Sequence, residues 1–254
     1  MTGILLRKEL KERVRSLKAP GILFLFFAVG LVAPLITVLS PYFLLLVQDE
    51  EVKKMLRPVL SDPTLQMGLV QYVKLLGFIP FTVVLLSMDS FAGERASGVM
   101  EYECSFPIER SNILYVKLMA DGLILLFGVL LCALGCFIIT LFLPGELHYP
   151  GFLAVHGLLY LFLIFLMAVM TYAGLLVRSI PVVASVGFVG YLFLRGFAAI
   201  PTIGPYTPGG LFSAAMALAT AQDPIEIEWC IGLSTLFIVI LIFSSKLKLQ
   251  TMEI

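Results

Sequence analysis

The stretch GFLAVHGLLYLFLIFLMAVMTYAGLLV, residues 151–177, contains no Asp, Glu, Lys or Arg. An α-helix rises about 1.5 Å per residue, so about 20 apolar residues cross the roughly 30 Å hydrocarbon core of a bilayer. The stretch is long enough to span a membrane with some tilt. It therefore predicts a transmembrane helix, and its length and apolarity are the criteria for identifying further spans in the chain.

The whole chain shares this apolar character. Hydrophobic residues make up 60% of it and charged residues only 13%, whereas soluble domains carry about 25% charged residues. The mean hydropathy is +1.03. We expect an all-α integral membrane protein with one transmembrane domain over residues 1–254. The net charge is zero, and the sequence shows no basic patch beyond the flanks of the spans, so we do not expect nucleic acid as a partner.

Six segments have the length and apolarity of transmembrane helices. The second carries Asp89 near one end and Lys74 near the other, and both are expected close to an interface. The predicted spans cover residues 21–47, 70–92, 118–143, 151–177, 180–201 and 227–246. The apolar piece 211–221 is too short to cross and follows a Pro- and Gly-rich run, so residues 202–224 are expected to form a short re-entrant helix at the outer face.

Lys and Arg residues indicate the orientation. They concentrate before the first span, after the sixth, and in the connections from the second to the third and from the fourth to the fifth span. Because such residues accumulate in cytoplasmic loops, both termini are predicted to be cytoplasmic. Residues 1–19 predict an amphipathic interfacial helix that places basic side chains beside an apolar stripe. These basic residues are Arg7, Lys8, Lys11 and Arg15. The alternative is a basic flank with no further role.

Candidate catalytic and metal sites are weak. Residues 93–98 begin and end with the glycines of a phosphate-binding loop, but Val99 and Met100 stand where Lys and Ser or Thr are required. Glu146, His148 and His156 could converge on a cation, although interfacial histidines explain them better. We predict no catalytic residue, no metal site and no cofactor bound by this chain.

Two cysteines, Asp121 and Arg195 fall in predicted spans. Cys132 and Cys136 are expected to pack in the third span. Asp121 is expected to pair with Lys117 across one helical turn. Arg195 lies about 15 residues from the inner end of the fifth span, roughly 22 Å deep. Its role is open between structure and a substrate pathway.

The loop 93–117 is too polar and too aromatic for a simple tether, and it contains a predicted helix around Glu94–Cys104. With the basic N-terminal segment LLRKELKE, its sequence GERASGVMEYECSFPIERSNILYVKL resembles the permease subunits of type-2 ATP-binding-cassette (ABC) transporters. Such permeases commonly show an E-R-x-x-G-T-hydrophobic-E run, a turn with Pro and Arg, and a Lys that opens the third span. Val99 replaces the usual Thr.

The resemblance implies that this loop is the coupling helix that contacts a separate cytosolic ATPase, which binds ATP and Mg²⁺. The residues expected to carry the contact are Glu94, Arg95, Gly98, Glu101, Tyr102, Glu103, Phe106, Pro107 and Arg110. It also implies a second permease, either another copy or a related chain, and ATP-driven export of an amphipathic or hydrophobic molecule across a prokaryotic cell membrane. Such cargo includes a peptide toxin, an antibiotic or drug, or a lipid. A self-contained secondary transporter or channel is the alternative.

Overall fold

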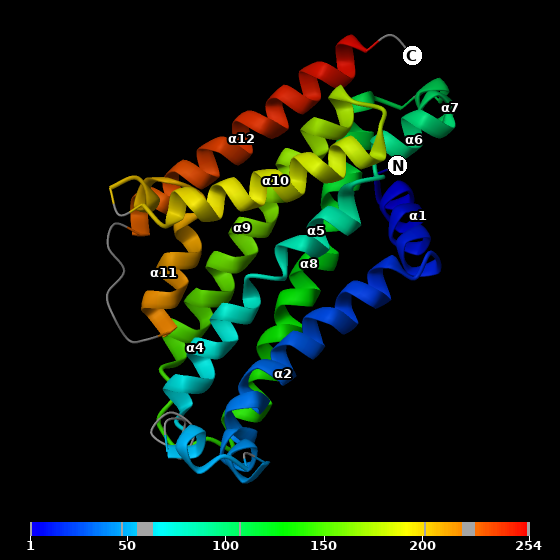
Figure 1. The fold of residues 1–254 in the computed structure, drawn as a ribbon. Helices are drawn as coiled ribbons and strands as arrows, with labels where there is room; N and C mark the ends of the chain where they lie inside the picture. Colours follow the sequence, from blue (N-terminus) through cyan, green and yellow to red (C-terminus); the bar gives the residue numbers. More distant parts are fainter. Residues whose placement is uncertain are drawn as a thin grey trace.

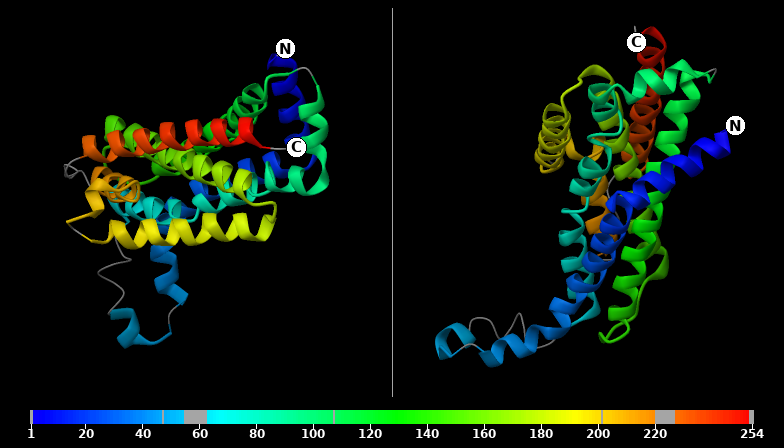
Figure 2. Two further views of the ribbon diagram at one scale, coloured as in Figure 1. Left: turned by 90° about the horizontal axis from the view of Figure 1, so that it is seen from above. Right: turned by 90° about the vertical axis from the view of Figure 1, so that its right-hand side faces the viewer.

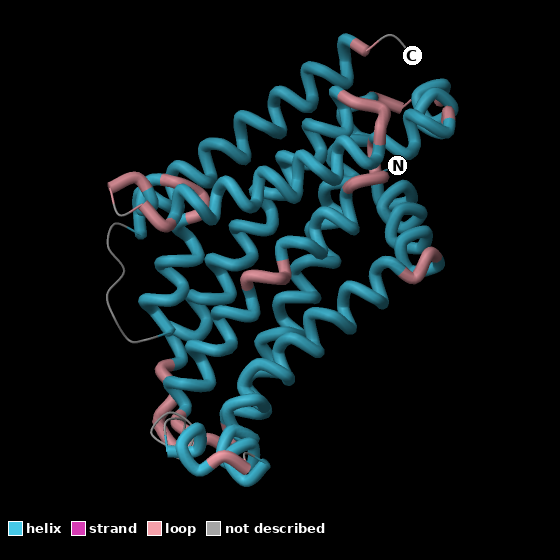
Figure 3. Tube along the Cα trace, viewed as in Figure 1, coloured by secondary structure: helices cyan, strands magenta, loops and turns pink. Residues whose placement is uncertain are grey.

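The computed structural model describes residues 2–46, 48–54, 63–106, 108–200, 202–219 and 227–252, and this part of the chain is helical without a strand (Figure 3). Six of its helical segments are long and apolar enough to cross a membrane. They are Lys18–Phe43, Leu65–Ser97, Arg110–Thr140, Tyr149–Leu176, Ile180–Ala198 and Ile227–Thr251. The prediction of an all-α protein with six spans is confirmed.

The elements follow one another along the chain as labelled in Figure 1. They are α1 (Thr2–Arg15), α2 (Lys18–Leu46), α4 (Leu65–Leu76), α5 (Pro80–Ser87), α6 (Ala92–Ser97), α7 (Val99–Ser105), α8 (Arg110–Thr140), α9 (Tyr149–Leu176), α10 (Ile180–Ala198), the 3-10 turn η1 (Gly204–Tyr206), α11 (Gly210–Ala219) and α12 (Ile227–Thr251). The start of α1 and the end of α12 lie at the same end of the bundle (Figures 1 and 2). We call this the termini end.

Helices α8 and α9 form the centre of the bundle. Helix α2 runs along α8, while α11 and α12 pack on α9. Small residues let α2 and α8 approach closely, since a Cβ atom at Gly30 would overlap the backbone carbonyl of Cys132. Cys132 and Cys136 are both fully buried. The expectation that they pack in the third span is therefore confirmed.

The second span begins earlier than predicted and is broken. Its helices α4 and α5 are separated by a turn at residues 77–79, visible as a loop in the middle of the span in Figure 3. Pro80 opens α5, and because proline has no N–H and clashes with the preceding turn, it interrupts helical hydrogen bonding there. Since the span starts at Leu65, Lys74 lies inside it and not at its edge.

The short helix α11 follows η1 and folds back against α9. The ring of Phe212 meets that of Phe162 with centroids 4.9 Å apart. This agrees with a short helix between the fifth and sixth spans. Residues 220–224 of the predicted re-entrant segment, and Val47 and Pro201 at the ends of two predicted spans, lie outside the described residues.

His156 was expected at the interface, and the structure corrects this. Its side chain is buried, with Nε2 2.6 Å from the Tyr72 hydroxyl and Nδ1 2.7 Å from the Phe152 carbonyl. Two hydrogen-bond partners from the protein satisfy the ring. Within the described ranges no three His, Cys, Asp or Glu side chains come together as a metal site.

Candidate functional site

The predicted coupling loop forms two helices where the sequence suggested one. Helix α6 ends at Ser97 and α7 begins at Val99, with Gly98 between them at φ = 76°. A residue with a side chain rarely adopts this left-handed backbone conformation, whereas glycine does so without steric penalty. Gly98 therefore turns the chain and gives α7 a direction of its own at the termini end (Figure 1).

Seven ionisable side chains from α1, α6, α7 and α8 lie together at this end, and we call them the charge cluster. They are Lys8, Glu9, Arg13, Glu94, Glu103, Lys117 and Asp121. Four are carboxylates and three are cations, so the charges nearly balance. Sequence analysis identified Glu94 and Glu103 as loop residues but missed that they join a buried network.

Lys117 on α8 is the centre of the charge cluster, because its side chain is only 1% exposed. Its Nζ atom lies 2.5 Å from Glu94 Oε1 on α6 and 3.2 Å from Glu9 Oε1 on α1. Glu103 on α7 contributes Oε2 at 3.6 Å and also pairs with Lys8. One ammonium group therefore contacts three other helices.

Asp121 pairs with α1 and not with Lys117, so the expected pair within α8 is wrong. Arg13 places Nε 2.5 Å from Asp121 Oδ1 and Nη1 2.5 Å from Glu9 Oε2. A Lys that precedes an acid by four residues is the weaker orientation for a helical ion pair. Lys117 instead pairs with acidic side chains from three other helices. Asp121 pairs with Arg13.

The charges of α1 stay ionised in this setting. Burial by itself raises the pKa of the Glu9 carboxyl, but the positive charges of Lys117 and Arg13 outweigh burial and hold the pKa below its ordinary value. Burial also opposes the charge of Arg13, yet the Asp121 carboxylate raises the pKa of the guanidinium. Helix α1 is therefore held against α8 by full charges, while its basic residues Arg7, Lys11 and Arg15 face outward.

Two arginines of the predicted contact hold helix ends. Arg95 donates from Nη1 to the Leu175 carbonyl at 2.7 Å, at the end of α9. Arg110 donates from Nη1 to the Met252 carbonyl at 2.8 Å, just past the end of α12. Cations at helix C-termini satisfy free carbonyls and the helix dipole. The structure thus connects the loop to the fourth and sixth spans.

The exposed part of the loop is aromatic. Tyr102 is 66% exposed and Phe106 44% exposed, and their rings meet edge to face with centroids 5.0 Å apart. Glu101 is half-buried, and its Oε2 atom has no hydrogen-bond partner among the described residues. Pro107, also predicted for the contact, lies outside the described residues.

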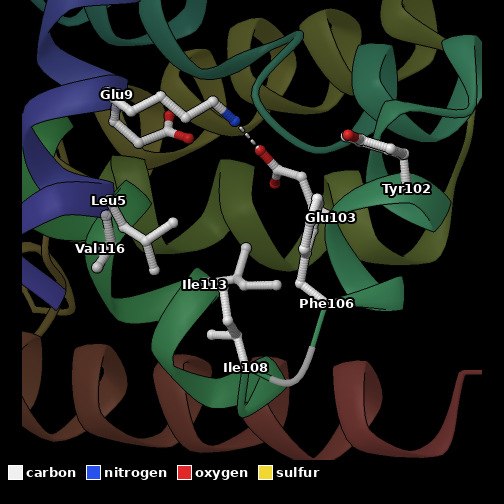
Figure 4. A pocket seen from close by; sticks show the side chains of 9 residues that line it. Leu5, Glu9, Tyr102, Glu103, Phe106, Ile108, Ile113 and Val116 are labelled. Carbon is white, nitrogen blue, oxygen red and sulfur yellow. Dashed lines mark hydrogen bonds and ion pairs between the residues drawn. The ribbon is translucent and has the colours of Figure 1, made fainter. Parts of the chain in front are cut away.

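Helices α1, α7 and α8 enclose a groove of about 340 Å³ at the termini end. Figure 4 shows the apolar side chains that line it and Glu103 at its edge, where Glu103 pairs with Lys8. Its lining residues are Leu5, Lys8, Glu9, Tyr102, Glu103, Phe106, Ile108, Ile113 and Val116. The groove thus combines exposed aromatic rings with one edge of the charge cluster.

Comparison with known proteins decides the family. The profile of the family described as ABC-2 family transporter protein matches residues 4–210, from α1 to the start of α11. The chain belongs to the ABC-2 transporter family. No curated protein matches the chain.

The family assignment makes the chain a multi-pass transmembrane subunit of an ABC transporter. Permeases of the ABC-2 family have no ATPase domain of their own and generally pair with an ABC ATPase subunit. The matched range includes most of α1, the loop 93–117 and all seven members of the charge cluster. The resemblance inferred from the loop sequence is confirmed.

Arg195, the predicted pathway residue, lies far from this loop. It is exposed near the end of α10, with its guanidinium carbon 5.1 Å from the centre of the Phe212 ring. The structure therefore separates two groups of predicted residues. The described residues of the predicted coupling loop lie at the termini end, whereas Arg195 lies within the spans.

Proposed function

We propose that this ABC-2 permease is the membrane subunit of an exporter, and that a separate ATPase docks on its groove at a cytoplasmic termini end. The ATPase binds ATP and Mg²⁺, and the permease supplies the path. The observation that carries the proposal is the exposed pair of Tyr102 on α7 and Phe106 directly after it. Exposed aromatic side chains at the edge of an apolar groove are typical centres of protein interfaces.

The charge cluster supports transmission of movement from the docked ATPase. A displacement of α7 acts through Glu103 on Lys117 in α8, and Lys117 is joined through Glu9 to α1. Because the cluster is ion-paired and, apart from Lys8, mostly buried, the four helices move more readily as one body than separately. Arg95 and Arg110 extend the same body to α9 and α12.

The basic face of α1 supports a position at the cytoplasmic membrane surface. Arg7, Lys11 and Arg15 point outward while Ile4 and Val14 are exposed apolar side chains. Such a helix lies at an anionic lipid surface with its apolar side chains in the acyl region. A second copy or a related permease completes the transporter in the cell membrane, and the cargo is amphipathic or hydrophobic.

The test is co-purification of the tagged full chain from its native membrane, followed by mass spectrometry and measurement of ATP hydrolysis. We expect an ABC ATPase in about equal amount. The double variant Tyr102→Ala/Phe106→Ala should lower ATPase capture about tenfold or more, since such anchors carry most interface energy. The matched control is Phe142→Ala/Tyr149→Ala, which removes two exposed aromatic rings from the opposite end.

If the wild-type chain purifies without an ATPase, a self-contained carrier replaces this proposal. If both double variants capture the ATPase equally well, docking occurs on another surface. Glu103 is unsuitable as a docking probe, because reversing its charge would also break the charge cluster.

A further inference from the structure

Two cationic side chains at the point where the second span is interrupted have no ion-pair partner among the described residues. They are Lys74 on α4 and Arg195 on α10. Cations without a partner are rare within membrane spans, and such residues mark ligand and ion pathways. The charge cluster at the termini end does not include Lys74 or Arg195, so their presence within the spans needs a separate explanation.

Both cations lie close to the helix break in the second span, Lys74 before it on α4 and Arg195 beside it on α10. Lys74 follows Leu65 by nine residues, about 14 Å along α4, and the break begins three residues later at Gly77. The Arg195 Nη2 atom is 4.0 Å from the position that a Cβ atom at residue 77 would occupy. With about 30 Å of hydrocarbon to cross, the break lies near the middle of the layer.

The break holds Arg195 in this position. The Tyr191 hydroxyl, one turn before Arg195, donates to the Gly77 carbonyl. The Phe212 ring lies under the guanidinium, with its centre 5.1 Å from the guanidinium carbon, and such cation–π contacts strengthen when water is excluded. Arg195 is thus held beside the break by contacts from α10 and α11.

Lys74 faces a groove between α2 and α4 with a volume of about 370 Å³. The described lining contains hydroxyl and amide side chains and no acidic residue. The polar lining residues are Thr37, Ser40, Thr64, Gln66, Gln71 and Lys74. A cation surrounded by hydrogen-bonding groups and lacking a carboxylate is suited to an anion, because charge-assisted hydrogen bonds are strong in a low dielectric.

We infer that the helix break between α4 and α5 binds the anionic group of an amphipathic molecule, a carboxylate or a phosphate, between Lys74 and Arg195. This inference rests on the proposed function, since it names the charge of the exported cargo. The apolar part of the molecule lies along the exposed side chains of α10. A broken helix near the middle of the membrane is a recurrent way to build a binding site in transporters.

The test measures binding to the purified full chain in a neutral detergent by native mass spectrometry. The probes are dodecyl phosphate and dodecyltrimethylammonium, which share one chain and differ in charge. We expect dodecyl phosphate to bind at least tenfold more tightly. Lys74→Gln and Arg195→Gln should each weaken the binding of dodecyl phosphate about tenfold and leave the binding of the ammonium probe unchanged. Arg195→Lys keeps the positive charge and should weaken the binding of dodecyl phosphate by a smaller factor.

The matched control is Lys248→Gln, which removes an exposed cation at the termini end. Equal binding of the two probes, or an equal loss in the Lys248 variant, overturns the inference. If Arg195→Gln does not elute as a folded protein, Lys74→Gln and Arg195→Lys decide the result. Because the chain is measured alone, failure of ATPase capture would overturn the proposed function and leave this binding result intact.

A resident anionic lipid would use the same chemistry as cargo, so a second measurement separates them. With the captured ATPase present, dodecyl phosphate should displace phosphatidylglycerol and raise ATP hydrolysis about twofold or more. If phosphatidylglycerol stays bound and ATP hydrolysis does not change, the site holds a structural lipid and the cargo assignment is overturned.

Discussion

The termini end and the helix break treat charge in opposite ways. At the termini end, three cations meet four carboxylates, and Lys117 alone contacts three of them. At the break, Lys74 and Arg195 have polar and aromatic neighbours and no ion pair among the described residues. Paired buried charges fix helices in one arrangement, whereas unpaired ones leave a site that a ligand of opposite charge can complete.

The largest expected effect separates these two regions directly. Lys117→Met removes the cation that three acids share and leaves buried negative charge, which costs about 3–5 kcal/mol. Equilibrium unfolding in mixed micelles should show this loss. Lys248→Met, on an exposed position, should stay within about 0.5 kcal/mol of the wild type. A stable Lys117→Met protein would mean that the cluster does not hold the helices together.

A double-mutant cycle on Arg13 and Asp121 sharpens the same comparison. Arg13→Met and Asp121→Asn should each destabilise the protein by about 3 kcal/mol, because each leaves one buried partner without its opposite charge. The double variant should be less destabilised than the sum by about 1–3 kcal/mol. Additive losses, measured in the same micelles, would show that the two side chains act independently.

Glu9 gives a pH dependence that the break should not share. Its pKa is lowered in the folded protein from an ordinary value of 4.5. The stabilisation by the carboxylate is therefore complete above about pH 4.5 and disappears as the pH falls through the lowered folded value. The stability difference between wild type and Glu9→Gln should shrink below about pH 4.5. A constant difference between pH 7 and pH 3 would contradict this prediction.

The smallest expected effect is that of Lys74→Gln on stability. Since Lys74 forms no ion pair among the described residues, its replacement should change the free energy of unfolding by no more than about 0.5 kcal/mol. The measurement in neutral detergent is the same as for Lys117→Met. A loss above about 2 kcal/mol would give Lys74 a structural partner and remove the contrast between the two regions.

Much of the fold could be predicted from the sequence because the membrane imposes simple rules. Long apolar runs with few or no charges identified the six spans, and the short run at 211–221 indicated the helix between the fifth and sixth. Motif spacing in the loop 93–117 pointed to the family. These signals are local, and each can be read from neighbouring residues.

The helix breaks were harder to predict. Gly98 and Pro80 are visible in the sequence, but a glycine within a helical pattern does not always end it, and a proline is tolerated in α2 at Pro34 and Pro41. Only packing decides which of these residues interrupts the helix. The turn at 77–79 is stabilised by the Tyr191 hydroxyl, which is 114 positions away along the chain.

The sequence by itself determined that this chain crosses a membrane six times, that its basic residues concentrate on one side, and that its polar loop belongs to an ABC-2 permease. Only the tertiary structure decided which charges are paired. Lys117 and Asp121 are one turn apart, yet each takes partners from α1, which is more than 100 positions away. Ion pairing depends on distances of a few ångströms between helices, and sequence separation does not contain those distances.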